Sequence, residues 1–163
     1  MTFTVYISYS QKNKELVNLL YSVLKQNNIN TYALDVTILP KIEGGSLYED
    51  IRRYISSSDY VFVLLTKDAL GSPNIFFEIG LARAMTPPKP ILLIIEPNVQ
   101  LPNEIKDLPY IVLSRENPSS TLEQIRQLSS NLKSQKEAGN AATGVLLLLG
   151  ALAFFAWLSS DER

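Results

Sequence analysis

Two short apolar runs place the strongest limit on how this chain can fold. Tyr60–Leu65 and Ile91–Ile95 carry no charged or amide side chain at any position. A strand with one face in water alternates apolar and polar residues, whereas a strand covered on both faces is apolar throughout. The two runs therefore predict strands inside a parallel sheet that has helices on both of its faces.

Three more strands and the helical segments between them complete an alternating pattern. We expect the strands at Thr4–Ser8, residues 30–34 and residues 110–113, which are short and rich in β-branched or aromatic residues. Apolar residues at helical spacing follow the first two strands, over residues 16–24 and 47–55. Strands that alternate with helices predict an α/β fold built as a right-handed parallel sandwich.

Capping residues mark the starts of the last two helices. Ser72 and Pro73 combine a capping hydroxyl with a proline at the first helical position, and predict a helix that runs to about Met85. Residues 120–123, Ser-Thr-Leu-Glu, have the spacing of a capping box, in which the hydroxyl and the glutamate satisfy backbone donors reciprocally. We expect the final helix to begin there.

Composition excludes several kinds of chemistry. The chain has 163 residues with 15 Lys and Arg against 16 Asp and Glu, so no excess of positive charge predicts nucleic-acid binding. It contains no cysteine and no histidine, which excludes thiolate nucleophiles, Ser-His catalysis and most transition-metal sites. We predict no metal and no cofactor. Any chemistry must depend on carboxylates, hydroxyls, amides and the backbone.

The C-terminal segment predicts a membrane anchor. Residues 138–160 carry no charge, and residues 141–158 are almost wholly apolar. About 20 such residues cross a bilayer as a helix, so we expect one domain over residues 1–132, a linker over 133–140 and a transmembrane helix over 141–160. Lys133 and Lys136 precede this segment and only Arg163 follows it, which predicts a single-pass protein with its N-terminal domain in the cytoplasm. The alternative is a helix buried on every side.

One acid stands out near the edge where a parallel sheet binds its ligands. Ligands of such sheets bind outside the carboxyl ends of the strands, and no glycine-rich phosphate loop occurs there, because Gly44-Gly45 lacks the spacing. Glu78 lies in an otherwise apolar helix, which favours a raised pKa for its carboxyl, and its neighbours Asn74 and Ala82 leave space for a ligand. The alternative is a rim glutamate that points into water.

Three sequence boxes, in order, resemble those of the Toll/interleukin-1 receptor (TIR) domains. Residues 5–10, Val-Tyr-Ile-Ser-Tyr-Ser, resemble the first box, and Asp35 with the Gly44-Gly45 loop resembles the second box and the BB loop. Ser72-Pro73 stands at the family's spacing before Glu78. The resemblance covers roughly residues 2–132 and implies a flavodoxin-like, five-stranded parallel sheet with helices on both faces.

The resemblance also implies an activity. In catalytic TIR domains the glutamate of the third box acts on the bond between ribose and nicotinamide of NAD⁺, which would be the role of Glu78, with NAD⁺ as substrate and not as cofactor. The residues then expected to bind the substrate are Ser8, Tyr9, Ser10, Asp35, Gly44, Ser72 and Asn74. Asp35 also fits a simple turn residue and Tyr9 an ordinary strand-end tyrosine. The chain departs from the family's usual residues at Asn13, Asn74 and Ser10.

Together with the C-terminal apolar segment, the resemblance implies a membrane-anchored NAD⁺ nucleosidase, a hydrolase or cyclase that forms homo-oligomers through TIR–TIR contacts and acts in prokaryotic antiviral defence or stress signalling. A second hypothesis is a non-catalytic TIR scaffold, or a nucleotide sensor, that assembles through the Gly44-Gly45 loop. Residues 77–82 together with Lys89-Pro90-Ile91 also resemble nucleoside deoxyribosyltransferases, which cleave a related N-glycosidic bond.

Overall fold

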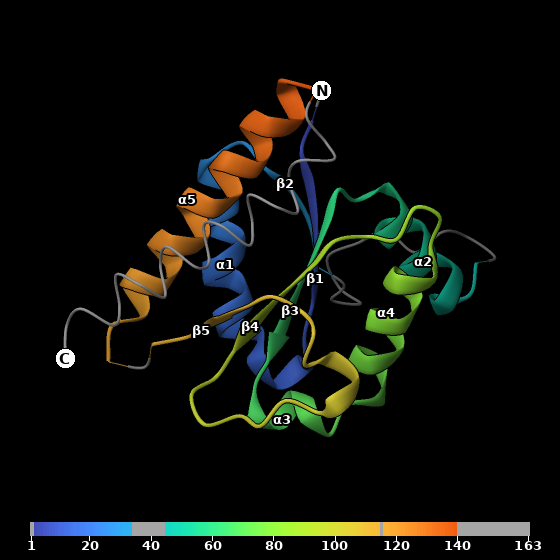
Figure 1. Ribbon diagram of the computed structural model, residues 1–163, viewed down its shortest axis with the longest axis vertical. Coiled ribbons are helices and arrows are strands. Elements are labelled where there is room, and N and C mark those ends of the chain that lie inside the picture. Colours follow the sequence, from blue (N-terminus) through green and yellow to red (C-terminus); the bar gives the residue numbers. More distant parts are fainter. Residues whose placement is uncertain (1, 34–44, 115, 140–163) are drawn as a thin grey trace.

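A computed structural model describes residues 2–33, 45–114 and 116–139 of the chain. These residues form one parallel sheet with helices on both faces (Figure 1). Its strands are β1 (Thr4–Ser8), β2 (Asn30–Ala33), β3 (Tyr60–Leu65), β4 (Ile91–Ile95) and β5 (Tyr110–Val112). The strand order β2-β1-β3-β4-β5 is that of flavodoxin-like folds. The predicted α/β class, the five strands and their parallel pairing are confirmed.

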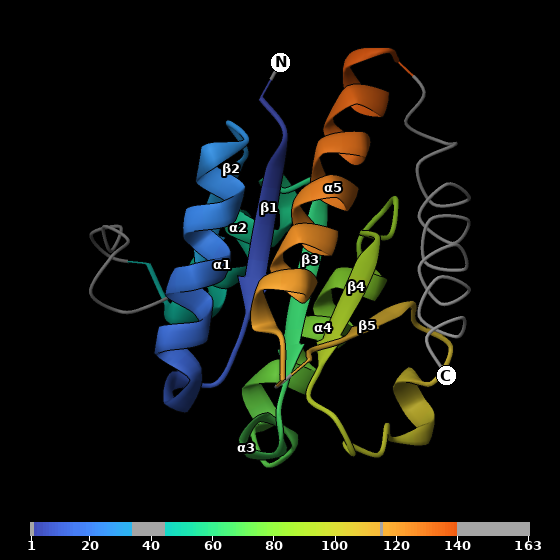
Figure 2. The ribbon, with the colours of Figure 1, turned by 90° about the vertical axis from the view of Figure 1, so that its left-hand side faces the viewer.

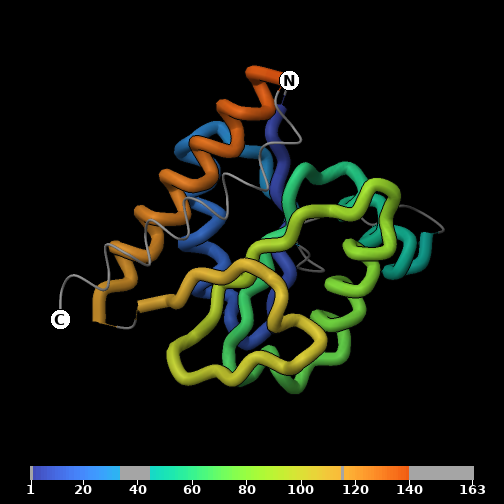
Figure 3. The backbone as a smooth tube through the Cα atoms, in the orientation of Figure 1, coloured from blue at the N-terminus to red at the C-terminus, as the bar shows by residue number. Residues whose placement is uncertain are grey.

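The helices divide into two layers. They are α1 (Lys14–Gln26), α2 (Leu47–Ser57), α3 (Lys67–Leu70), α4 (Pro73–Ala84) and α5 (Pro118–Glu137), with 3-10 turns η1 (Gln11–Asn13) and η2 (Asn103–Ile105). Figure 2 shows α1 and α5 side by side in front of the sheet, with α2 and α4 behind it. The backbone tube in Figure 3 shows the same separation.

Each layer has its own apolar core, because successive strand side chains point to opposite faces of the sheet. On the α1–α5 side the central strands contribute Val5, Ile7, Phe62 and Leu64, all at most 1% exposed. On the α2–α4 side they contribute Tyr6, Val61, Val63, Leu65 and Leu93, all 0% exposed. The continuous apolar runs in β3 and β4 thus serve both cores, as predicted for strands covered on both faces.

One helix start and one helix cap differ from the sequence-based expectations. The helix α5 begins at Pro118, two residues before the expected capping box, and its cap is Asn117, whose side chain accepts a hydrogen bond from Ser120 N at 3.2 Å. The Glu123 carboxylate binds the Arg126 guanidinium instead of a backbone donor. Ser72 is the N-cap residue of α4 and Pro73 is its first residue, but the Ser72 hydroxyl makes no capping hydrogen bond.

The end of α5 is tied to the sheet. This helix continues to Glu137, so residues 133–137, where the sequence predicts a linker, are helical. Lys136 Nζ lies 2.7 Å from the Asp59 carboxylate, which also accepts a hydrogen bond from Thr4 N at 2.8 Å. Lys133 Nζ donates to Asn27 O at 3.2 Å, at the end of α1.

The predicted membrane localisation is corrected by the structure. Within residues 2–33, 45–114 and 116–139, no helix combines the length and the apolar character that crossing a bilayer requires. The helix α5 has 20 residues, but charged side chains such as Glu123, Arg126 and Lys133 would have to enter hydrocarbon. The expected transmembrane helix, residues 141–160, lies outside the described residues. The finding that no described helix could span a membrane contradicts the predicted single-pass localisation.

Candidate functional site

The carboxyl end of β1 brings a buried hydroxyl to the α2–α4 side of the sheet. Ser8, the last residue of β1, is 1% exposed and shares its face with Tyr6, because residues two apart on a strand point the same way. Tyr9 is half-buried and packs against the apolar cluster of the α1–α5 side. Ser10 caps η1, where its hydroxyl accepts a hydrogen bond from Lys12 N at 3.4 Å.

Glu78 lies opposite these β1 side chains, on α4. The helical spacing of Ile75, Glu78, Ile79 and Ala82 makes one buried stripe, and the carboxyl is the polar member of it. Glu78 is 8% exposed. The alternative interpretation, a rim glutamate that points into water, is therefore wrong.

The surroundings of Glu78 set its protonation. Burial raises the pKa of the Glu78 carboxyl from 4.5 to about 7, while the nearby hydroxyls of Ser8 and Tyr6 oppose this increase because they stabilise the charged form. Burial also raises the pKa of the Tyr6 phenol far above its usual range, and the Glu78 charge adds to the effect. The carboxyl therefore binds a proton much closer to neutral pH than an exposed glutamate does.

Two buried oxygen atoms in this cluster have no hydrogen-bond partner. Ser8 Oγ lies near the carboxyl without completing a hydrogen bond of ordinary geometry, and both Ser8 Oγ and Glu78 Oε2 are unpartnered. Buried polar atoms in folded proteins almost always have a partner, and leaving one without is costly. The two atoms therefore mark a place where a polar group of a ligand would gain hydrogen bonds.

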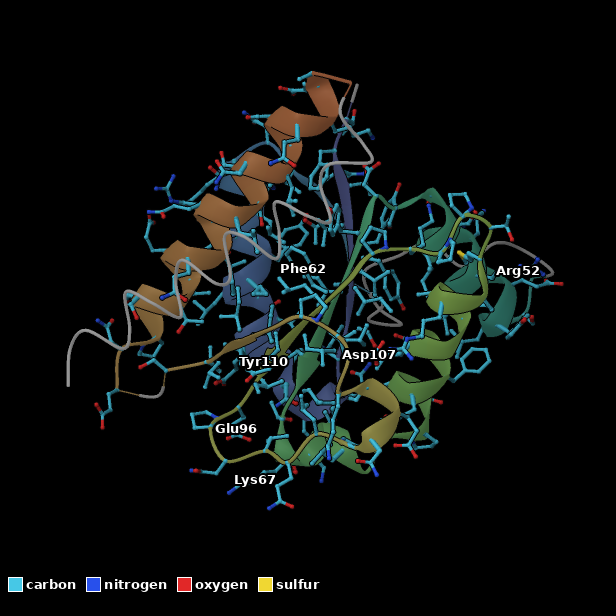
Figure 4. All side chains as sticks on the ribbon, in the orientation of Figure 1. Arg52, Phe62, Lys67, Glu96, Asp107 and Tyr110 are labelled. Carbon is cyan, nitrogen blue, oxygen red and sulfur yellow. The ribbon has the colours of Figure 1, made fainter. Side chains whose placement is uncertain are left out.

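The loops at the carboxyl edge of the sheet are joined by hydrogen bonds. Thr66, which directly follows β3, donates to Asn13 Oδ1 at 2.8 Å and accepts from Ala69 N at 3.2 Å as the cap of α3. Lys67 N donates to Glu96 Oε2 at 3.0 Å, and Figure 4 shows both residues at the same end of the sheet. These contacts connect the segments after β1, β3 and β4, beside the end of β1 that carries Ser8.

The remaining expected site residues are distributed unevenly. Ser72 is half-buried at the start of α4 and Asn74 is exposed in its first turn. Phe77, beside Glu78 in sequence, packs against Tyr48 of α2 with tilted rings whose centroids are 5.4 Å apart. Asp35 and Gly44 lie outside the described residues.

The structure thus brings Ser8 and Glu78 together and adds Tyr6, which the sequence analysis did not select. The signal was present, because Tyr6 and Ser8 are two apart in a strand and must share a face. Within the described ranges no group of three or more Asp or Glu side chains could hold a metal ion.

Comparison with protein families assigns the fold. The family model described as TIR domain matches residues 5–129 of the chain. The chain belongs to the TIR domain family. No curated protein sequence matches it, and the comparisons do not support the resemblance to nucleoside deoxyribosyltransferases.

Solved structures agree with this assignment at the level of the fold. The TIR domain of a Toll-related receptor from Hydra magnipapillata is 17% identical, with a TM-score of 0.62 over 76% of this chain and 94% of that one. A prokaryotic SEFIR domain is 16% identical, with a TM-score of 0.55 over 78% of this chain and 92% of that one. A diflavin flavoprotein from Nostoc sp. is 8% identical, with a TM-score of 0.53 over 90% and 97% of the two chains. These identities show a shared fold and nothing finer.

Proposed function

We propose that this TIR domain is an NAD⁺ nucleosidase that cleaves the bond between nicotinamide and ribose, with Glu78 as its catalytic carboxylate. The observation that carries the proposal is the buried Glu78 carboxyl, whose Oε2 and the adjacent Ser8 Oγ lack partners. A biological role in prokaryotic antiviral defence or stress signalling is part of the proposal.

The chemistry requires little beyond a placed negative charge. The nicotinamide of NAD⁺ is a cationic pyridinium, so it takes the bonding electrons and leaves as a neutral molecule without a general acid. Positive charge then develops on the ribosyl carbon, as in glycoside cleavage, and the ionised Glu78 carboxylate would stabilise it. Water attacks this carbon in hydrolysis and loses a proton, whereas a ring nitrogen of the adenine attacks it in cyclisation.

The other site residues would hold the substrate. The Ser8 hydroxyl, unpartnered beside Glu78, is suited to a ribose hydroxyl. Ser72, whose hydroxyl is not used as a helix cap, Asn74 and Tyr9 are proposed to contact more distant parts of the dinucleotide. Ser10, Asp35 and Gly44 are proposed as substrate-binding on the family resemblance.

Self-association is the second part of the proposal. Leu47 and Tyr48 at the start of α2 and Phe77 on α4 are 59%, 46% and 43% exposed, and the Tyr48 ring contacts the Phe77 ring. Exposed apolar side chains that are grouped in this way favour a protein interface. We propose that this surface binds a second copy of the chain. It also supports the competing hypothesis of a scaffold that assembles without catalysis.

The experiment that tests the function follows nicotinamide release by chromatography when the full-length protein, at high concentration, is incubated with NAD⁺. We expect release that increases with protein concentration. NADH is the matched control, because its dihydronicotinamide is neutral in the substrate and is a far poorer leaving group. If NAD⁺ stays intact at concentrations where the protein forms oligomers, the scaffold hypothesis replaces the enzyme.

A further inference from the structure

A tyrosine in the middle of the α2–α4 core has an unexplained hydroxyl. Tyr6 is 0% exposed and is surrounded by the apolar side chains of its cluster. Phenylalanine would fill such a position without the cost of removing a phenol from water. A buried phenol is therefore expected to have a polar partner. The Glu78 carboxyl, which is 8% exposed on the same side of the sheet, acts on the Tyr6 hydroxyl.

The neighbours of Glu78 leave Tyr6 and Ser8 as the groups that control it. From β1, these two hydroxyls act on the carboxyl, and Tyr9 acts on the Tyr6 phenol. From α2, the buried Asp50 lies 3.8 Å from the Arg53 guanidinium. The part of β3 that packs beneath α4 contributes the apolar residues Val61, Val63 and Leu65. Among the described residues, no lysine or arginine contributes to the shift of the Glu78 carboxyl.

We propose that Tyr6 is a positioning residue, whose phenol donates to one oxygen of the Glu78 carboxylate so that the unpartnered Oε2 is directed at the substrate. The catalytic part of this inference rests on the proposed function. A carboxylate held through one oxygen has a fixed orientation, and the donated hydrogen bond favours the charged form that the reaction needs. Burial favours the protonated Glu78 carboxyl. The hydrogen bond from the Tyr6 hydroxyl therefore keeps a larger share of the carboxyl in its charged form.

The test replaces the hydroxyl and nothing else. The variant is Tyr6→Phe, and the matched control is Tyr60→Phe, which removes a buried phenol from the other face of the sheet, where Tyr60 stacks near Phe3. In proteins labelled with ¹³C at the glutamate carboxyl, NMR titration reports the Glu78 pKa, assigned with Glu78→Gln. We expect the Glu78 pKa to rise by about one pH unit in Tyr6→Phe and to be unchanged in Tyr60→Phe.

Kinetics give a second readout. The rise of kcat with pH should move to higher pH by the same amount in Tyr6→Phe, with little change in KM, whereas a loss of packing alone would lower the rate equally at every pH. An unaltered Glu78 pKa in Tyr6→Phe overturns the inference. If the wild-type protein releases no nicotinamide, the proposed function fails, while the titration still decides whether Tyr6 controls Glu78.

Discussion

The two faces of the sheet differ in what they bury. The α1–α5 side buries apolar side chains, together with uncharged hydroxyls such as those of Thr121 and Ser129. The α2–α4 side also has an apolar core, but the two buried carboxyls of the described residues, Asp50 and Glu78, lie there. Both sides derive from the same strands, so the difference comes from the helices and from alternate strand positions.

This difference between the two faces predicts which substitutions act on stability and which act on catalysis. An apolar face gains free energy with every side chain it removes from water, whereas a buried carboxyl with an unpartnered oxygen lowers stability. Proteins depart from such rules mainly at functional sites. The comparison therefore predicts that substitutions on the α1–α5 side act on folding, while substitutions around Glu78 act on chemistry.

The largest expected effect on stability comes from the apolar face. Leu128 of α5 is 1% exposed, and Leu128→Ala should lower the free energy of unfolding by about 3 to 4 kcal/mol, because it removes buried methyl groups and leaves a cavity. The rate of nicotinamide release per folded molecule should not change. Urea unfolding and initial rates measured on the same samples check both statements. If the rate of nicotinamide release per folded molecule falls in Leu128→Ala, the proposed difference between the two faces of the sheet is wrong.

Next is the pH dependence that Glu78 confers. The carboxyl has a pKa of about 7 in the fold against 4.5 as its ordinary value, so the folded state binds more protons between these limits. The stability contribution is complete below pH 4.5 and is lost as pH rises through 7, by about 3 kcal/mol. The difference in unfolding free energy between wild type and Glu78→Gln, measured from pH 4 to 8, should show this slope. If this difference in unfolding free energy does not vary with pH, the Glu78 carboxyl is exposed to water in the folded protein.

A smaller effect is expected where the loops of the carboxyl edge are joined. Thr66→Val removes the hydrogen bond to Asn13 and the cap of α3, and should cost about 1 to 2 kcal/mol in unfolding free energy. Because these loops lie beside Ser8, KM for NAD⁺ should increase while kcat changes little. Urea unfolding and steady-state kinetics test the two effects, and an unchanged stability would show that the bridge is not formed.

The smallest effect belongs to an exposed ion pair. Arg126→Ala breaks the contact with Glu123 on the outer side of α5, where both side chains are about half exposed. Solvent and side-chain entropy limit such pairs, so the free energy of unfolding should change little. Thermal unfolding in low and high salt checks this. A clear loss of stability in Arg126→Ala would mean that the exposed face of α5 stabilises the fold in addition to its apolar face.

Local patterns in the sequence predict most of the fold. Continuous apolar runs located β3 and β4, and helical spacing located α1 and α2, because these signals depend on nearby residues. The start of α5 was misplaced, since Asn117 and Ser120 are both good caps and the backbone geometry selects between them. The membrane prediction rested on hydropathy at residues 141–160, outside the described residues, and no described helix supports it.

The candidate site was predictable only in part. Glu78 and Ser8 could be selected from the family boxes, but their proximity depends on how α4, 70 residues after Ser8 in the chain, packs over the sheet. Tyr6 was missed because an aromatic residue in a buried strand is ordinarily a packing residue. The strand spacing places Tyr6 on the same face as Ser8, but the carboxyl beside its hydroxyl comes from another element, and no local pattern places that carboxyl there.

The most direct test of the central claim compares nicotinamide release by wild type, Glu78→Gln and Glu15→Gln at pH 8 and equal protein concentration. Glutamine keeps the size of the side chain and removes the charge that would stabilise the ribosyl cation, so Glu78→Gln should be at least about 100-fold slower. Glu15 is exposed on α1, and its substitution should leave the rate within about twofold of wild type. A folded Glu78→Gln protein that cleaves NAD⁺ as fast as wild type would contradict the account.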